Sequence, residues 1–565
     1  MKKILLLLFC FSFIKADATN VSGIISTNTT WTKANSPYIV NDNLSVDSNV
    51  TLVIQPGVTV LVDSGKFFYV DGKLIAEGNT TDSIYFLAHK INDPLYYAQW
   101  RGITLRLKGI HDTSSFKYCR FEYALYAIYS EGPSLNVSQS VFKHNSVAVE
   151  THVFAPAVDC YFNINNCLVT ENGKGLYNFS RYATGALTNC IISDNIVGCE
   201  DESYKGLTVQ NNEFNYNETG LSLSDYEQSP DVRWNTFKGN SYAGLTFRNS
   251  PTNISGFSRT KNAPISNNLF IYNTRGLQIW DLDLCTISDN TIAYNDIGID
   301  RNSGASNTPS YPDSLVITNN CLTNNLSYNF KENYTADFTL KYNWWGTTSI
   351  PGIDSSIYDY YDNFSSGKIT YMPILTSDTG CQSVTPPPLC AQLDSVVAKA
   401  TSPTTATVNW PAVPGALGYE FYVELIQSTP PTKGTVTTSN ILSLTGLVPG
   451  STYKICARTK CAAAPFIYTW VCDTIQVPTA INTVDIESPV TIYPNPSNGS
   501  FTIDLPTKEV ANIVVTGLDG RVVYSDTKEG SNKISVRMID HVAGIYLVHI
   551  TQGQNTYRTR ITIEE

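Results

Sequence analysis

Short runs of alternating apolar and polar residues recur along the chain, separated by Asn and Gly residues. The string NNEFNYNETGL at Asn211–Leu221 returns as NNLFIYNTRGL at Asn267–Leu277, and more loosely as DNTIAYNDIGI at Asp289–Ile299. The repeated unit lacks the 3.6-residue apolar spacing of an amphipathic helix. Each run is therefore predicted to be a β-strand that buries alternate side chains.

The Asn of each Asn-x-apolar triplet marks the register of this repeat. Successive triplets are 23, 23, 23, 33, 22, 30 and 23 residues apart, so the unit is about 23 residues long and two units carry insertions. A leucine-rich repeat would need a fixed L-x-x-L-x-L frame, so the unit predicts a parallel β-helix. The aligned asparagines are Asn166, Asn189, Asn212, Asn235, Asn268, Asn290, Asn320 and Asn343.

We expect these asparagines to turn corners rather than to contact a ligand. Asn tolerates the left-handed backbone conformation, and its amide can bond to the Asn of the next coil, which would form a ladder. Cys167 and Cys190 follow the aligned Asn in consecutive units, and Cys321 follows it further on. Stacked apolar thiols and a disulfide are both open interpretations of these cysteines.

The segments that flank the repeats resemble the two ends of secreted right-handed β-helix proteins. Tyr38–Gly78 contains a QPGVTV turn followed by a VDGKL strand, and Tyr342–Leu375 begins with YNWWG. The resemblance implies an all-β, right-handed parallel β-helix of the pectin lyase-like kind over residues 19–380, closed by a cap at each end. The aromatic residues of the second segment also suit a sugar platform.

The composition and the strand spacing of the chain change after the repeats. Residues 381–390 contain TPPPL, which predicts a stiff extended linker. Residues 391–478 then show strands at the spacing of a β-sandwich, and Trp410 and Tyr453 resemble the core Trp and the tyrosine corner of a fibronectin type III module. Cys461 and Cys472 flank a predicted hairpin and are the expected disulfide pair. The remaining cysteines of this region, an odd number, are Cys381, Cys390 and Cys456.

The last segment, residues 489–565 after a linker at 479–488, carries TIYPNPSNGSFTIDL, GLDGRVVY and GIYLVHI in that order. Together these resemble the type A C-terminal sorting domain of proteins exported by the type IX secretion system of Bacteroidota. The resemblance implies a small β-sandwich that the type IX translocon recognises and that is normally cleaved after export. The motif residues are Tyr493, Pro494, Asn495, Pro496, Gly499, Gly520, Gly544 and Tyr546.

The first 18 residues predict a secretory signal peptide. Lys2 and Lys3 precede the apolar run Ile4–Ile14, and Ala16-Asp17-Ala18 is a small-x-small cleavage site. No later segment offers about 18 consecutive apolar residues, so no transmembrane segment is expected after the signal. The two ends of the chain together predict a secreted or outer-membrane surface-attached protein.

Composition narrows the choice of ligands. The 565 residues carry a net charge of -11 and no basic stripe, which argues against a nucleic-acid partner. The 6 His residues and the lack of a C-x-x-C motif predict no metal site and no cofactor. Calcium at Asp354, Asp359 and Asp362 is conceivable, but these residues lack the spaced Asp-x-Asp-x-Asp-Gly loop.

The outer flank of the coils is the candidate functional surface. In the strand after each Gly, alternation turns every second side chain outward. Trp280 could then stack on a sugar ring while Arg248 contacts an acidic substituent, which suits an extended polysaccharide. The candidate ligand-binding residues are Ser222, Ser224, Asp225, Thr246, Arg248, Gln278, Trp280, Asp300 and Arg301.

Binding of a polysaccharide or of a surface partner, as in adhesion, is the main hypothesis, and two others remain open. A polysaccharide lyase needs a cation and a base, and a glycoside hydrolase needs two or three carboxylates. The candidate catalytic residues are Asp281, Asp283, Asp300 and Arg248. The chain lacks the motifs associated with β-helix enzymes. A structural stalk is the second alternative, because any long β-helix must expose polar side chains.

Overall fold

A computed structural model describes residues 18–91, 98–108, 113–153, 160–225, 230–249, 263–280, 285–302, 315–386, 390–426, 434–461, 468–479, 490–517, 521–538, 542–553 and 555–564. The predicted signal peptide, apart from Ala18, lies outside these residues, as do Asp281, Asp283 and Gly520. The chain divides into two compact units. One extends to Val477 apart from Val448–Gly450, and the other holds that short segment and Pro478–Glu565.

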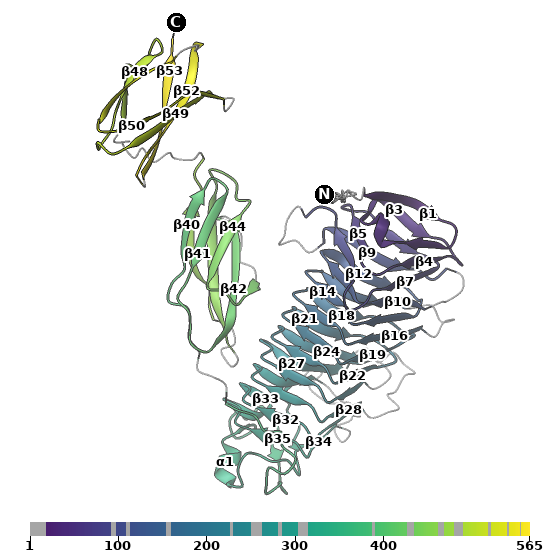
Figure 1. Cartoon of the computed structure of the whole chain (residues 1–565). Coiled ribbons are helices and arrows are strands. Elements are labelled where there is room, and N and C mark those ends of the chain that lie inside the picture. Colours follow the sequence, from purple (N-terminus) through teal and green to yellow (C-terminus); the bar gives the residue numbers. More distant parts are fainter. Residues whose placement is uncertain are drawn as a thin grey trace, which may run out of the picture. The chain divides into compact units, whose positions relative to one another are not determined.

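The first unit begins with a parallel β-helix, as predicted, in which every strand pairs in parallel with the equivalent strand of the next coil (Figure 1). Three columns of strands build its three faces. One face is formed by β2 (Thr29–Trp31), β4 (Thr51–Ile54), β7 (Lys73–Glu77), β10 (Ser114–Lys117), β13 (Leu135–Ser138), β16 (Cys160–Asn165), β19 (Ala183–Thr188), β22 (Leu207–Gln210), β25 (Asp231–Arg233), β28 (Ala263–Ser266), β31 (Cys285–Ser288) and β34 (Leu315–Thr318).

The other two faces form one continuous sheet through β3 (Tyr38–Val46), which also pairs with β1 (Thr19–Ile25). The short-strand face holds β5 (Thr59–Val62), β8 (Ile84–Ala88), β11 (Cys119–Glu122), β14 (Val141–Lys143), β17 (Leu168–Thr170), β20 (Ile191–Ser193), β23 (Glu213–Asn215), β26 (Thr236–Lys238), β29 (Leu269–Ile271), β32 (Thr291–Ala293) and β35 (Cys321–Thr323).

The third face of the β-helix is the long-strand face. It holds β6 (Phe68–Val70), β9 (Trp100–Leu105), β12 (Ala124–Ser130), β15 (Val147–Thr151), β18 (Lys174–Asn178), β21 (Val197–Asp201), β24 (Thr219–Asp225), β27 (Ala243–Asn249), β30 (Arg275–Trp280), β33 (Ile297–Asn302), β36 (Tyr328–Glu332) and β38 (Ile357–Tyr358). Its strands are the ones that follow the Gly residues of the repeat, so this is the flank on which the sequence predicts a ligand site.

Identical side chains stack through the core because each coil repeats the residue types of the last. The rings of Phe214, Phe237 and Phe270 are parallel, with centroids 4.9 and 4.6 Å apart. All three rings are fully buried. Stacking of equivalent rings at the spacing of the coils buries apolar surface on each of these coils, which stabilises the solenoid.

Two asparagine ladders run along the corners. In the first, the side-chain amide of each Asn donates to the Oδ1 atom of the Asn on the next coil, and so does its backbone N–H. The residues of this ladder are Asn212, Asn235, Asn268, Asn290, Asn320 and Asn343. The second ladder, which the sequence did not predict, is formed by Asn145, Asn172, Asn195, Asn217, Asn240, Asn273, Asn295 and Asn325.

The alignment of the first two asparagines was wrong by one position. Asn166 and Asn189 have φ of 52° and 55° and turn the corner, whereas Cys167 and Cys190 occupy the ladder position. The backbone N–H of Cys190 donates to Oδ1 of Asn212 at 2.9 Å, and that of Cys167 donates to Sγ of Cys190 at 3.3 Å. The ladder position needs only an acceptor that faces this N–H, so a thiol can replace the amide there.

The C-terminal end of the β-helix is closed by irregular segments. These carry a short helix, α1 (Ile350–Asp354), and a two-stranded sheet of β37 (Phe338–Thr339) and β39 (Ile369–Thr370). Trp345 is buried, and its ring meets that of Tyr371 edge-on. This arrangement agrees with the predicted cap.

The predicted linker is bound to the β-helix over its first half rather than free. A disulfide joins Cys381 to Cys321, and the backbone N–H of Gln382 donates to Oγ1 of Thr291 at 2.8 Å. Val384 packs against a small apolar cluster on β29 and β32, and the hydroxyl of Tyr272 donates to the carbonyl of Thr385. Cys321 is therefore not equivalent to Cys167 and Cys190: it follows the ladder residue and points to the linker.

The next segment is an antiparallel β-sandwich of a three-stranded and a four-stranded sheet. Trp410 is buried and packs edge-on against Tyr419, at 5.4 Å between the ring centroids. The assignment to fibronectin type III modules stays a prediction. The strands are β40 (Val397–Ser402), β41 (Thr405–Asn409) and β44 (Ile441–Thr445), with β43 (Thr435–Thr437), β42 (Ala416–Leu425), β45 (Thr452–Cys461) and β46 (Val471–Gln476).

The expected pairing of Cys461 with Cys472 is wrong. Cys456 lies directly opposite Cys472 in the β45–β46 ladder and forms a disulfide with it. Cys461 lies beyond the part of β45 that pairs with β46 and forms a disulfide with Cys390. Cross-strand register, which the hairpin alone does not define, therefore decides the pairing.

The second unit is a smaller antiparallel sandwich. Asn495 of the Y-P-N-P motif accepts a hydrogen bond from the backbone N–H of Thr562 at 2.9 Å and donates to the carbonyl of Arg560 at 3.1 Å. The motif is thereby attached to the last strand of the chain. The strands are β47 (Thr491–Tyr493), β48 (Ser500–Asp504) and β51 (Lys533–Arg537), with β50 (Val522–Lys528), β49 (Ala511–Gly517), β52 (Gly544–Gln552) and β53 (Asn555–Ile563).

Candidate functional site

A continuous row of outward positions runs along the long-strand face, one from each strand. Each member is flanked in sequence by inward, buried residues, so alternation turns it away from the core. We call this row the outer column. It consists of Tyr69, Thr104, Tyr129, Glu150, Tyr177, Glu200, Ser222, Thr246, Gln278, Asp300, Lys331 and Tyr358.

Four predicted ligand-binding residues, Ser222, Thr246, Gln278 and Asp300, lie in the outer column on consecutive coils. The last three are buried, with 7%, 5% and 3% of their surface exposed. Asp300 accepts hydrogen bonds from Nε of Arg275 at 2.8 Å and from the side-chain amide of Asn333 at 3.0 Å. The carboxylate of Asp300 is therefore already engaged within the protein.

A parallel row contains Ser224, Arg248 and Trp280, which also lie on consecutive coils as expected. The guanidinium of Arg248 lies over the ring of Trp280, 5.7 Å from its centroid. Each side chain thus contacts the other, which is a weak cation–π pair at an exposed site. Asp225 follows in the same strand, but its side chain, like Asp281 and Asp283, lies outside the described part of the chain.

Arg301 lies on the inward side of its strand, because β33 continues to Asn302 and alternation places Arg301 opposite Ile279 of the core. It is buried and forms an ion pair with Glu332 at 2.7 Å. Its guanidinium is also 4.3 Å from the ring centroid of Phe338. Burial raises the pKa of Glu332 to about 7 despite the adjacent Arg301.

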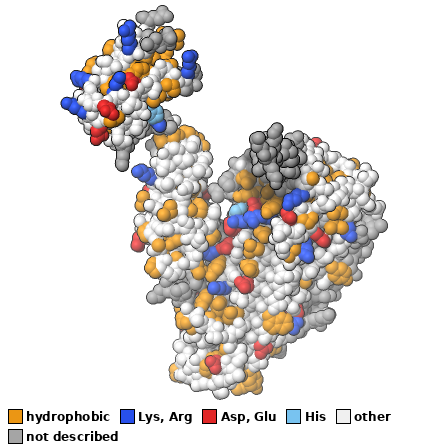
Figure 2. Space-filling view, in the orientation of Figure 1, with side chains coloured by type: hydrophobic (Ala, Val, Ile, Leu, Met, Phe, Trp, Pro, Cys, Tyr) orange, Lys and Arg blue, Asp and Glu red, His pale blue; other side chains and the backbone are white. Residues whose placement is uncertain are grey.

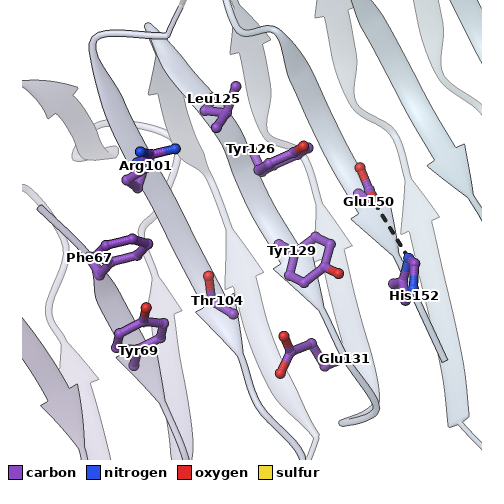
Figure 3. A pocket seen from close by; sticks show the side chains of 10 residues that line it. All are labelled: Phe67, Tyr69, Arg101, Thr104, Leu125, Tyr126, Tyr129, Glu131, Glu150 and His152. Atoms are coloured by element: carbon purple, nitrogen blue, oxygen red, sulfur yellow. Dashed lines mark ion pairs between the residues drawn. The ribbon is translucent and has the colours of Figure 1, made fainter. Parts of the chain in front are cut away.

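The N-terminal part of the outer column lines a pocket of about 440 Å³ that the sequence did not predict (Figure 3). Its walls come from four consecutive coils. Figure 3 shows Arg101 and Phe67 on one side of Tyr126 and Tyr129, and Glu150 and His152 on the other. The lining residues are Phe67, Tyr69, Arg101, Thr104, Leu125, Tyr126, Tyr129, Glu131, Glu150 and His152.

Two groups of the pocket have shifted acidities. Glu150 is 7% exposed, and burial raises the pKa of its carboxyl to about 7, although Lys174 on the next coil acts in the opposite direction. Burial, reinforced by Glu150 and Glu131, raises the pKa of Tyr129 to about 12. Nδ1 of His152 lies 3.8 Å from Glu150. At neutral pH the pocket therefore holds a carboxyl group that gains and loses a proton readily.

Arg101 is the basic group of this pocket. Its side chain is exposed and lies over the ring of Phe67, 5.5 Å from the centroid. Within the described residues no carboxylate forms an ion pair with it, whereas Arg106 of the same coil pairs with Asp71 at 2.6 Å. On the surface seen in Figure 2, acidic, basic and hydrophobic side chains lie interspersed over the β-helix.

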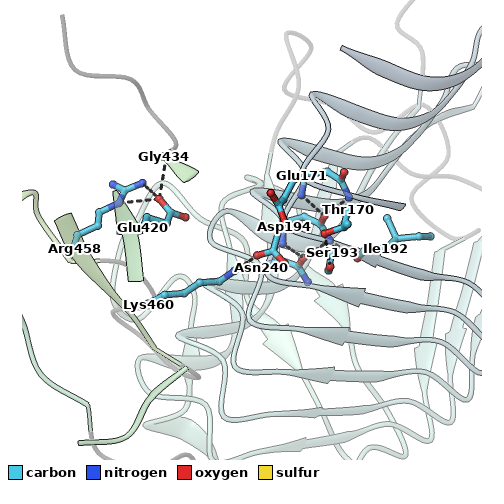
Figure 4. A network of polar contacts seen from close by, with 12 residues as sticks. Thr170, Glu171, Ile192, Ser193, Asp194, Asn240, Glu420, Gly434, Arg458 and Lys460 are labelled. Carbon is cyan, nitrogen blue, oxygen red and sulfur yellow. Dashed lines mark hydrogen bonds and ion pairs between the residues drawn. The ribbon is translucent and has the colours of Figure 1, made fainter. Parts of the chain in front are cut away.

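Several further polar contacts of the described residues lie away from the outer column. Figure 4 includes Thr170 and Ser193, whose hydroxyls are 3.1 Å apart on adjacent coils of the short-strand face, and Arg458, which pairs with Glu420 at 2.6 Å within the sandwich. Asp359 accepts backbone N–H groups at a turn. Across the described ranges, no group of three or more His, Cys, Asp and Glu side chains could hold a metal ion.

Two families of known proteins match parts of the chain. Residues 126–292 match the family model described as right handed beta helix region, and residues 491–564 match that of the secretion system C-terminal sorting domain. No curated protein sequence matches the chain. No helix of the described part is long and apolar enough to cross a membrane.

Solved structures that match part of the chain include the periplasmic alginate epimerase AlgG, which is 14% identical. That match covers 60% of this chain and 77% of the epimerase, with a TM-score of 0.31. A mutant of the same epimerase is 13% identical over the same shares, with a TM-score of 0.33. A segment of two fibronectin type III domains from chicken tenascin is 14% identical over 31% of this chain and 100% of that segment, with a TM-score of 0.13.

The chain contains a parallel β-helix, of which residues 126–292 match the right-handed β-helix family. It carries at its C-terminus the sorting domain of the type IX secretion system, which directs export to the cell surface or the surroundings. The predicted all-β fold with a parallel β-helix, and the predicted export by the type IX secretion system, are thereby confirmed.

Proposed function

We propose that the exported β-helix binds an extended polysaccharide along its long-strand face. The observation that carries this proposal is the outer column, in which twelve outward positions follow one another from Tyr69 to Tyr358. Adjacent coils are about 4.8 Å apart, so the members of the column that are not buried offer contacts at multiples of this spacing along a linear ligand. They include Tyr69, Tyr129, Tyr177, Ser222 and Tyr358.

The chemistry of the column supports a carbohydrate. Tyr69, Tyr129, Tyr177 and Tyr358 present rings with a polar hydroxyl, a combination that can stack on a sugar and also bond to it. Ser222 and Glu200 lie between these rings in the column and add hydroxyl and carboxylate groups. Few precisely placed polar groups among aromatic ones are typical of small-molecule sites.

The proposal is tested by electrophoresis of the full chain in gels that contain polygalacturonate, dextran sulfate or dextran. Retardation of the wild-type protein by at least one polymer is expected, and Ser222→Trp, which places a bulky ring in the middle of the column, should reduce it. Tyr161→Ala is the matched control, because Tyr161 is an exposed aromatic residue on the face built by β16. Absence of retardation by every polymer contradicts the proposal.

A second candidate function is catalysis in the pocket, by lyase or hydrolase chemistry. It is favoured by the juxtaposition of Glu150, Tyr129 and Arg101, which combine a titratable carboxyl, a phenol and a cation. The same polymers, incubated with the protein, would then yield unsaturated or reducing ends, and Glu150→Gln would abolish the product. Binding of a polymer without formation of unsaturated or reducing ends would favour a non-catalytic role.

A further inference from the structure

The pocket of the N-terminal coils has an asymmetric distribution of charge. Arg101 is on β9 and Glu150 is on β15, two coils further along, with Tyr126 and Tyr129 of β12 between them. The two residues are two coils apart, about 10 Å along the stack, and Arg101 also precedes by three residues Thr104, the β9 residue in register with Tyr129 and Glu150, so their α-carbons are about 14 Å apart. That length fits one or two sugar units, with one unit over each tyrosine.

Arg101 is available to an anion, whereas its neighbours are not. Arg106 and Lys108 both lie within ion-pair distance of Asp71, at 2.6 and 3.7 Å. Within the described residues, Arg101 has no ion-pair partner, and its guanidinium lies over the ring of Phe67. A guanidinium held against a ring presents its N–H groups to one side, which suits a carboxylate or a sulfate of a ligand.

Glu150 lies at the end of the pocket opposite to Arg101. Neither of its carboxyl oxygens forms a hydrogen bond with a described residue. The titratable and charged groups around it come from every neighbouring strand. They are Arg101 of β9, Tyr129 and Glu131 of β12 and its following turn, His152 after β15, and Lys174 and Tyr177 of β18. Lys174 also pairs with Glu200, so its charge is shared with another carboxylate.

A ligand that covers the pocket would remove the remaining water from Glu150. Loss of water disfavours the charged form of a carboxyl, so it would become protonated and could donate a hydrogen bond to a sugar hydroxyl. The cost of holding two negative groups, the ligand acid and Glu150, in one pocket acts in the same direction.

We propose that this pocket binds an acidic sugar unit of the polysaccharide, with its acid group on Arg101, and that binding takes up one proton from solvent onto Glu150. This inference rests on the proposed function, and it adds the class of ligand and its dependence on pH. The shared chemistry is an anionic substituent, a uronate carboxylate or a sulfate ester.

The proton uptake has a defined effect on affinity. Because the carboxyl pKa is raised to about 7 in the free protein, affinity should be constant well below that pH and fall above it. Between pH 6 and pH 8 the fall amounts to about tenfold for a single proton. His152 lies beside Glu150, so His152→Gln tests whether the pH dependence requires this neighbouring ring.

The experiment measures affinity of the full chain for oligomers of galacturonate, for dextran sulfate and for dextran, by titration calorimetry at pH 6 and pH 8 in buffers of different ionisation enthalpy. The wild-type protein is expected to bind an acidic polymer with uptake of about 0.1 proton at pH 6 and about 0.9 proton at pH 8, because the free carboxyl is already mostly protonated at the lower pH. Arg101→Ala should weaken that binding about tenfold or more, and Arg101→Lys less. Glu150→Gln should remove most of the pH dependence.

Arg120→Ala is the matched control, because Arg120 is a partly exposed arginine on the short-strand face and does not line the pocket. Equal affinity of wild type and Arg101→Ala for the acidic polymers would overturn the inference while leaving polysaccharide binding in place. So would equal binding of dextran, or a pH dependence that survives in Glu150→Gln. Failure of the wild-type protein to bind any polymer would instead reject the proposed function itself.

Discussion

The side-chain amide of Asn212 donates a hydrogen bond to Oδ1 of Asn235, one coil further along the β-helix, at 3.0 Å. The backbone N–H of Asn212 donates to the same oxygen at 2.9 Å. Asn235 repeats the arrangement towards Asn268, so each buried amide satisfies the corner backbone of the preceding coil. Such a network is stabilising only while every member is present.

Replacement of a ladder residue should therefore be costly. Asn235→Ala leaves the carbonyl of Val209 and the backbone N–H of Asn212 without their partners, and we expect a loss of about 3 kcal/mol in stability. Thermal unfolding of the full chain measures it. Asn211→Ala is the control, because Asn211 is exposed and supplies only a left-handed corner, with φ of 57°. An equal loss in both variants would contradict the role of the ladder.

The two arginines predicted to bind ligand should respond differently to removal. Arg301→Ala leaves the fully buried Glu332 without its cation, which should cost about 3–5 kcal/mol. Arg248→Ala removes an exposed cation that contacts Trp280 and should cost about 0.5–1 kcal/mol. Denaturation curves of the two variants give the comparison. A stable Arg301→Ala variant would show that the pair with Glu332 is dispensable.

The disulfide between Cys321 and Cys381 should protect the linker from proteolysis. In the double variant Cys321→Ser, Cys381→Ser, the contacts of Gln382, Val384 and Thr385 remain but are no longer tethered. We expect faster cleavage within residues 376–390, detected by mass spectrometry of the fragments. Cys456→Ser with Cys472→Ser, which opens a disulfide inside the sandwich, is the control and should not accelerate cleavage at that segment.

The acidity of Glu150 predicts a pH dependence of stability. Its carboxyl pKa is raised from 4.5 to about 7, so the folded chain retains a proton that the unfolded chain has lost. The contribution of this retained proton to the free energy of unfolding is fully present below pH 4.5 and is lost as the pH rises through 7. Wild type should thus lose on the order of 2–3 kcal/mol relative to Glu150→Gln between these limits.

Melting temperatures of the two proteins, measured from acidic to alkaline pH, give that difference. Taking the difference removes the contribution of other groups, among them Glu332. Glu213→Gln, at an exposed position, should run parallel to wild type throughout. Parallel curves for Glu150→Gln would show that the Glu150 carboxyl is not destabilised by burial.

The contacts of Asn495 predict a role in sorting. Asn495→Ala loses both hydrogen bonds to the last strand and should release the Y-P-N-P segment from the domain surface. We expect less of the chain at the cell surface and more in the periplasm, measured by fractionation. Asn512→Ala, at an exposed position of β49, is the control. Unchanged export of Asn495→Ala would show that the translocon does not require this attachment.

Several features followed from the sequence because they depend on a period. A repeat of about 23 residues places equivalent positions on adjacent coils, so the stacking of Ser222, Thr246 and Gln278 could be predicted without knowing the coil geometry. The C-terminal domain was recognisable because its motifs are contiguous in the chain. The repeat period and the sorting motifs are both patterns of residues close together in the chain, so they can be read from the sequence alone.

The tertiary structure decided everything that depends on a shift of one residue or on segments far apart in the chain. Whether Arg301 points out or in depends on where β33 ends, because neighbours in a strand face opposite ways. The disulfides depend on cross-strand register and on where the linker lies. The pocket forms because Arg101, Tyr129 and Glu150, separated by loops of unequal length, meet on adjacent coils, and only the paired backbone brings them together.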